Sequence, residues 1–134
     1  MDDPAAPFRE LQRRRRRPRL SQDEIDRAAG LLGDADLKLR FFVGDLLARQ
    51  GKRSAPALLL QADSPQEEIR RSALHVLGKI AQRLEKGGPY KRAAARLRLG
   101  LRDDDAKARK NCAVYEAENE NNDQSEERAR APDQ

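Results

Sequence analysis

The sequence contains no tryptophan, one histidine and one cysteine among its 134 residues. A single cysteine, Cys112, excludes an internal disulfide and is typical of a reducing compartment. β-Branched residues are few and do not alternate with polar ones, which argues against strands. No stretch reaches the roughly 20 apolar residues that a membrane span needs. The start, Met1-Asp2-Asp3, is typical of neither a secretory signal nor a transit peptide. We therefore expect a cytoplasmic or nuclear protein with no membrane partner.

Charge is abundant: 38% of the residues are charged and 37% are hydrophobic, with a net charge of +5. Residues 1–20 hold seven arginines and three acids (+4), and residues 116–134 hold seven acids and two arginines (−5), which leaves +6 for the middle. Pro4, Pro7 and Pro18 interrupt the first 20 residues, whose arginines repel one another, and the segment beyond Tyr115 lacks an apolar period. We therefore predict a disordered Arg-rich tail (1–20), a helical domain (21–115) and a disordered acidic tail (116–134). A basic folded domain favours an acidic partner.

The clearest helix is predicted over residues 64–84. Its apolar stripe comprises Ile69, Ala73, Val76, Leu77, Ile80 and Leu84, and Ser64, Pro65 and Glu67 predict a capping box at its start. Similar patterns predict helices over 21–32, after a capping box of Ser21 and Glu24, and over 37–50 and 89–101. A short apolar segment, 55–60, precedes the central helix.

The helices form a repeated unit of helix, turn and second helix. Turn residues Asp34, Asp63 and Asp103 precede Arg40, Arg70 and Arg109 by six, seven and six residues, and an apolar residue comes directly before each arginine. One helical pair cannot bury its stripe alone. We therefore predict an all-α fold, a short α-solenoid of about three helical hairpins.

The pattern Asp63, Ile69-Arg70, Ala73, Leu77-Gly78 resembles HEAT repeats of the short, phycobilisome-lyase-like variety. The resemblance covers about residues 20–115, and it is best in the second unit. It implies that the turn aspartates and the helix arginines form a polar ladder between units. It implies stacking and binding, but no single chemistry.

Catalytic groups are scarce. His75 lies about 240° round the wheel from Ile69, on the exposed side, and has no companion ligand or base. Cys112 takes a core position of its unit, which indicates a buried thiol. The run Asp103–Asp105 is explained by turn formation and capping. We expect no catalytic residue, no cofactor and no metal site, and hence no enzyme.

The candidate partner-binding residues project from the second helix of each unit, which lines the concave face in HEAT-like arrays. They are Lys38, Phe41, Arg49, Arg71, His75, Lys79, Lys107 and Lys110. For Phe41 we favour packing against a neighbouring helix over a role as a binding anchor, because exposed aromatic residues are costly. The basic residues are equally consistent with a solvated face.

The leading hypothesis is a scaffold that holds an acidic segment of a partner protein on this basic face. The alternative is nucleic-acid binding, chiefly RNA, through the basic tail of Arg13, Arg14, Arg15, Arg16, Arg17 and Arg19, a run that also fits a nuclear import signal or a solvated tail. A weaker alternative is a lyase- or chaperone-like helper.

The third unit ends the array without a polar cap, since Glu116, Glu118 and Glu120 follow its last apolar residue. Its apolar face comprises Leu97, Leu101, Ala108, Cys112 and Tyr115. We expect this open end to bind a partner or a second copy of the chain, or to fray.

Overall fold

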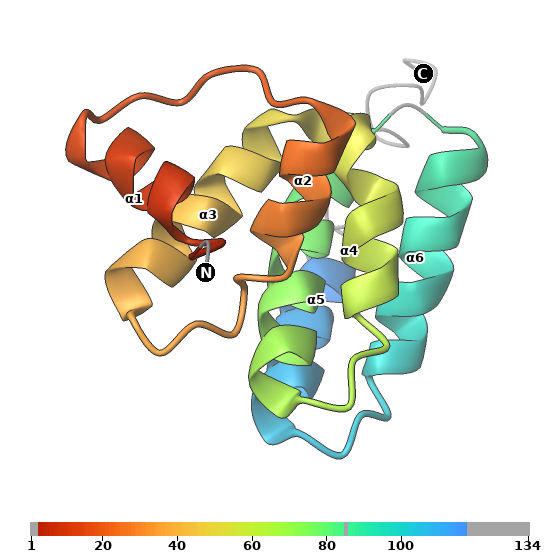
Figure 1. The fold of residues 1–134 in the computed structure, drawn as a ribbon. Coiled ribbons are helices and arrows are strands. Elements are labelled where there is room, and N and C mark those ends of the chain that lie inside the picture. The colour runs from red at the N-terminus through yellow and green to blue at the C-terminus, as the bar shows by residue number, and fades with distance from the viewer. Residues whose placement is uncertain (1–2, 85, 118–134) are drawn as a thin grey trace, which may run out of the picture.

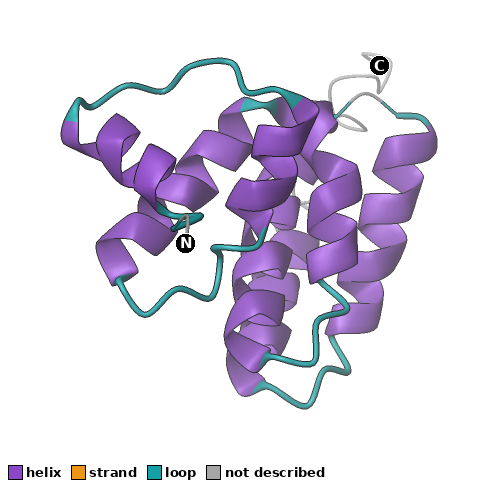
Figure 2. Cartoon of the chain, viewed as in Figure 1, coloured by secondary structure: helices purple, strands orange, loops and turns teal. Residues whose placement is uncertain are grey.

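A computed structural model describes residues 3–84 and 86–117 (Figure 1). Its regular elements are α1 (Ala6–Arg13), α2 (Gln22–Ala29), α3 (Leu37–Arg49), the short 3₁₀ helix η1 (Gly51–Ser54), α4 (Ala55–Gln61), α5 (Glu67–Ala81) and α6 (Gly88–Gly100). Residues 106–117 form a further helix. No strand occurs in these described ranges, which confirms the all-α class (Figure 2). No helix within them is long and apolar enough to cross a membrane.

The helices follow one another as pairs. Helices α2 and α3 pack together, as do α4 and α5, and α6 is followed by the helix of residues 106–117. The first helices are in contact along the molecule (α2 with α4, α4 with α6), and the second helices likewise (α3 with α5). The segment 55–60, predicted only as a short apolar stretch, is the first helix of the middle pair.

Side-chain caps set two of the helix starts, and the one at α2 was predicted. Ser21 and Glu24 form a complete capping box at α2, and the Asp36 carboxylate accepts from the backbone N–H groups of Lys38 and Leu39 at α3. The prediction for the central helix is wrong at its start. Helix α5 begins at Glu67, and the Ser64 hydroxyl accepts from the Gln66 N–H, forming a turn before the helix instead of capping it.

The apolar core runs through all three pairs. Of the stripe predicted on α5, Ala73, Val76, Leu77 and Ile80 are buried, and each fully buried leucine contributes roughly 1.5–3 kcal/mol. The third pair also buries most of its predicted face: Leu97, Ala108, Cys112 and Tyr115 are at most 2% exposed. Leu101 is the exception, at 40% exposure.

The N-terminal segment differs from the prediction of a disordered tail over residues 1–20. Helix α1 packs against α3 and buries Ala5 and Phe8. It ends in a Schellman motif: Arg15 has a φ of 55°, and the Arg16 N–H donates to the Leu11 carbonyl. The physical reason is apolar burial by Phe8 and Leu11, which outweighs repulsion within the arginine run. The predicted acidic tail falls, beyond residue 117, outside the described residues.

Candidate functional site

A groove of about 500 Å³ runs along the second helices of the three pairs. Its apolar lining comes from Leu32, Leu37, Phe41 and Val76. Its polar lining comes from α3, α5 and residues 106–117, and comprises Arg40, Asp45, Arg71, Ser72, His75, Lys79, Lys107 and Asn111, together with the backbone of Gly44. A groove of this size can hold several side chains of a bound segment.

The most exposed apolar side chain in this groove is Phe41. It is 71% exposed, and the neighbouring Leu37 is 56% exposed. The preferred interpretation, in which Phe41 packs against another helix, is therefore wrong. A phenyl ring left in water inside a groove is the kind of group that gains most when a partner covers it.

The groove is positively charged. Within the described chain, no carboxylate forms an ion pair with Lys79 or Lys107. Arg71 and Asp45, by contrast, are already compensated: Arg71 pairs with Asp105 at 2.9 Å, and Asp45 pairs with two arginines. Arg40 also lacks a carboxylate partner among the described residues, but its Nε and Nη2 groups donate to the backbone carbonyls of Gly33 and Asp34. The two lysines therefore carry the positive charge whose donors are most available to a ligand.

His75 is exposed in the groove wall, as predicted. Partial burial lowers the pKa of His75, and the positive charge of Lys79 lowers it further. The imidazole is therefore neutral near pH 7.

The structure brings together five of the eight residues proposed for partner binding, namely Phe41, Arg71, His75, Lys79 and Lys107. Lys38, Arg49 and Lys110 do not line the groove, and Arg49 pairs with Asp45 at 3.1 Å. Sequence reasoning missed Leu37 and Asn111. Asn111 could have been identified, because it lies four residues after Lys107 and therefore on the same face of the helix.

The ladder arginines share one register. Arg40, Arg70 and Arg109 each donate to the backbone carbonyl six residues earlier, with shortest N···O distances of 2.7, 3.2 and 2.7 Å. For Arg70 this carbonyl belongs to Ser64, not to the predicted Asp63. The Asp63 carboxylate instead accepts from Arg96 Nε at 3.0 Å, and Asp34 contributes its backbone oxygen to Arg40.

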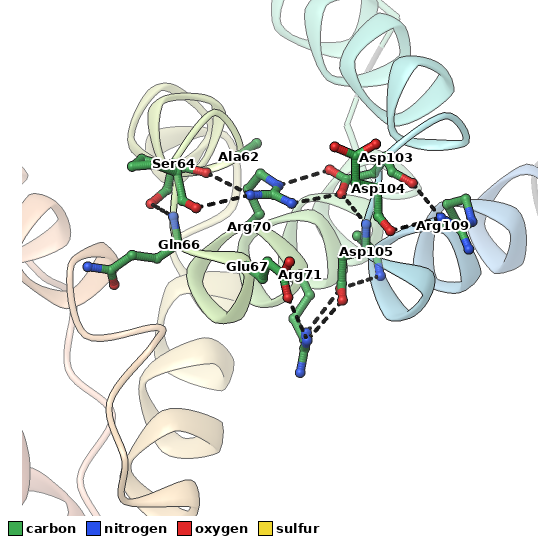
Figure 3. Close-up of polar contacts among 12 residues, drawn as sticks. Ala62, Ser64, Gln66, Glu67, Arg70, Arg71, Asp103, Asp104, Asp105 and Arg109 are labelled. Atoms are coloured by element: carbon green, nitrogen blue, oxygen red, sulfur yellow. Dashed lines mark hydrogen bonds and ion pairs between the residues drawn. The ribbon is translucent and has the colours of Figure 1, made fainter.

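Two ion pairs join the second and third units (Figure 3). Arg70 Nε and Nη2 donate to the two oxygens of Asp103 at 3.0 and 2.9 Å, and Arg71 makes the same bidentate contact with Asp105 at 3.1 and 2.9 Å. Hydrogen bonds from these guanidinium groups lower the pKa of Asp103 and of Asp105. Arg70 thus binds a carboxylate of the adjacent helical pair, and its side chain is 16% exposed. Arg40 and Arg109 differ from the expected ladder: within the described residues they bind no carboxylate, and their acceptors are backbone carbonyls of their own turns.

The arginine run is partly engaged by the fold. Arg13 and Arg14 pair with Glu10, whereas Arg17 pairs with Asp45 at 2.6 Å and lies over the Phe42 ring, 5.5 Å from its centroid. Three further arginines of the run are exposed and have no ion-pair partner within the described residues: Arg15, Arg16 and Arg19.

Cys112 is fully buried, as predicted, and burial raises its pKa to about 11. A thiol with this pKa is protonated at neutral pH and is a poor nucleophile.

No protein-family model matches the chain, and neither a curated protein nor a solved structure was found to match it.

Proposed function

We propose that the chain is a non-catalytic, HEAT-like scaffold that binds an acidic segment of a partner protein in the groove. The observation that carries the proposal is the juxtaposition of the exposed Phe41 with Lys79 and Lys107, which lack ion pairs among the described residues. A segment with carboxylates and one or two large apolar side chains satisfies both features: the ring gains a dry contact and the lysines gain counter-charges.

The repeat interpretation, a short α-solenoid of three stacked hairpins, is supported by two observations. The three ladder arginines use one hydrogen-bond register, with a carbonyl acceptor six residues earlier. First helices contact first helices along the molecule, and second helices contact second helices. Such stacking produces extended concave surfaces that serve binding.

The non-catalytic assignment is supported by the state of the reactive groups. Cys112 is buried, and its thiol pKa is raised to about 11. His75 has no carboxylate or thiol beside it in the groove lining other than Asp45, whose charge is taken by Arg17 and Arg49.

Selection of a random peptide library displayed on phage against the full chain tests the proposal. We expect enriched peptides to be net acidic and to contain a large apolar residue. In titrations by fluorescence anisotropy, Phe41→Ala should weaken their binding about 10- to 30-fold, the effect of losing one binding hot spot. Lys79→Glu should weaken it similarly and flatten its salt dependence.

The matched control is Lys38→Glu, which makes the same charge change at an exposed lysine outside the groove. Binding should change less than about twofold. Equal losses for the two lysine variants, or full binding by Phe41→Ala, would contradict the proposed groove.

One observation favours RNA binding as a second candidate. A recess of about 340 Å³ is lined by Arg17, Arg19, Arg49 and Arg53, with Pro18 and Gln50. Arg17 and Arg49 share Asp45, whereas Arg19 and Arg53 form no ion pair among the described residues, and two such arginines beside one recess suit a phosphate group. Filter binding to single-stranded RNA should then fall steeply with salt, and Arg19→Gln should reduce the slope of log K against log salt by about 0.7, since each released counterion contributes that amount for single strands. An unchanged slope would refute this candidate.

A further inference from the structure

Arg70 divides its guanidinium between two tasks. Its Nη1 group donates to the carbonyls of Ser64 and Pro65, at 3.2 and 3.4 Å, and this holds the side chain against its own turn. Its Nε and Nη2 groups are thereby aimed at the next unit, where they bind both oxygens of Asp103 (Figure 3).

Arg109 repeats the first task. Its Nη1 group donates to the carbonyls of Asp103 and Asp104, at 2.7 and 3.0 Å, again six and five residues earlier. Its Nε and Nη2 groups have no acceptor among the described residues, and the side chain is exposed. The arginine is therefore held in the binding geometry with its carboxylate absent, so little side-chain entropy remains to be lost on binding.

The adjacent residue repeats as well. Arg71 follows Arg70 and binds Asp105, and Lys110 follows Arg109 and is exposed without an ion-pair partner in the described ranges. The acceptor at the internal junction is an acid-x-acid turn that opens a helix: Asp103 accepts the Asp105 N–H, and Asp105 accepts the Ala108 N–H, while both bind arginine.

We propose that Arg109 and Lys110 form a docking site for a helix-opening acid-x-acid turn of another protein. The internal junction supplies the template, and charge complementarity supplies the attraction. The site is distinct from the groove, because neither residue lines it.

A second copy of this chain is a poorer occupant than another protein. Its own free acid-x-acid turn, Asp34-Ala35-Asp36, lies at the start of α3. To stack in the geometry of the internal junctions, a preceding helix would have to lie on α3, on the side away from α5. Helix α1 already packs against α3 and buries Phe8 there.

The test uses NMR of the arginine Nε–Hε groups in the full chain. The probe is a synthetic peptide of residues 100–113 with Arg109 and Lys110 replaced by alanine, which keeps the acid-x-acid turn and removes two of the four basic residues of this segment. We expect this peptide to shift the Arg109 Nε–Hε signal in a saturable manner. A control peptide with Asp103→Asn and Asp105→Asn should bind at least about tenfold more weakly, because the charge-assisted hydrogen bonds are lost.

Arg109→Lys keeps the charge and a donor for the turn carbonyls but loses the fork, and Lys110→Gln removes only an exposed charge. Because Arg109→Lys removes the reporting Nε–Hε group, binding to the variants is measured by fluorescence anisotropy of the labelled peptide. Both variants should weaken binding of the probe at least about fivefold, and Lys79→Gln in the groove should not, so this site and the proposed function can fail separately. Equal shifts with the asparagine peptide, or a response at Arg70 in place of Arg109, would overturn the proposal. A concentration-dependent dimer in sedimentation equilibrium that Arg109→Lys abolishes would also overturn it, since the occupant would then be a second copy.

Discussion

Replacing Arg70 by methionine should destabilise the protein by about 2–3 kcal/mol. The change keeps the length of the side chain but removes two charge-assisted hydrogen bonds to Asp103 and leaves that carboxylate 7% exposed, with only the Asp105 N–H to satisfy it. Breaking a fully buried ion pair costs about 3–5 kcal/mol, and an exposed pair contributes about 0.2–1 kcal/mol. At 16% exposure for Arg70, the pair belongs near the lower end of the buried range.

Urea unfolding followed by circular dichroism measures this loss. With a slope of about 1–1.5 kcal/mol per molar, the midpoint should fall by about 2 M. Arg49→Met is the matched control, because its pair with Asp45 has side chains 57% and 45% exposed and should contribute about 0.3–0.5 kcal/mol. If Arg70→Met stays within about 0.5 kcal/mol of the wild type, Asp103 is satisfied by water and the ladder has no stabilising role.

Three further changes have defined outcomes. Gly100→Ala should lower the free energy of unfolding by about 1–3 kcal/mol in the same urea assay, because the added Cβ would overlap Cys112 Sγ. Adding Cys112→Ala should restore part of this stability. The control Gly30→Ala, whose Cβ would lie 3.4 Å from the nearest atom, should be neutral or stabilising. Binding of an acidic peptide should strengthen as pH falls from 7 toward 5, because bound carboxylates raise the lowered pKa of His75, and His75→Gln should remove this trend in anisotropy titrations. The stability that Asp105 contributes is present above its unfolded pKa of about 3.9 and is lost as pH falls through its lowered folded pKa. Asp105→Asn should therefore make the free energy of unfolding less dependent on pH in the acid range. An unchanged pH dependence would refute the pairing with Arg71.

The parts of the fold that follow from local chemistry could be predicted from the sequence. The capping box of Ser21 and Glu24 depends on residues three apart. The spacing of six residues from Asp34 to Arg40 and from Asp103 to Arg109 was visible too, although the acceptor is the backbone carbonyl of the same turn and not the expected carboxylate of a neighbouring unit. Such contacts form within a turn or two, whatever the rest of the chain does. The stripe on α5 was predictable because its period is set by helix geometry.

The parts of the fold that depend on contacts with distant segments could not be predicted from the sequence. Phe8 lies in a segment whose composition favours disorder, and its burial needs the face of α3, which begins 29 residues later in the chain. The exposure of Phe41 is the opposite case: helical spacing placed it on the outward face, but whether a neighbouring helix covers that face depends on how α3 and α5 pack. Ser64 replaced Asp63 in the ladder because either residue fits the sequence pattern, and the backbone of the turn decides between them.

The contact of Arg17 with Asp45 and Phe42 ties the use of the arginine run to the integrity of the N-terminal helix. A receptor that binds an extended basic segment, as import receptors do, can contact every arginine of the run only after Arg17 leaves α3 and the Schellman turn at Arg15 opens. The free energy of that opening is subtracted from the receptor's affinity. Recognition of this segment and closure of the helical core at α1 are therefore mutually exclusive states of the same residues.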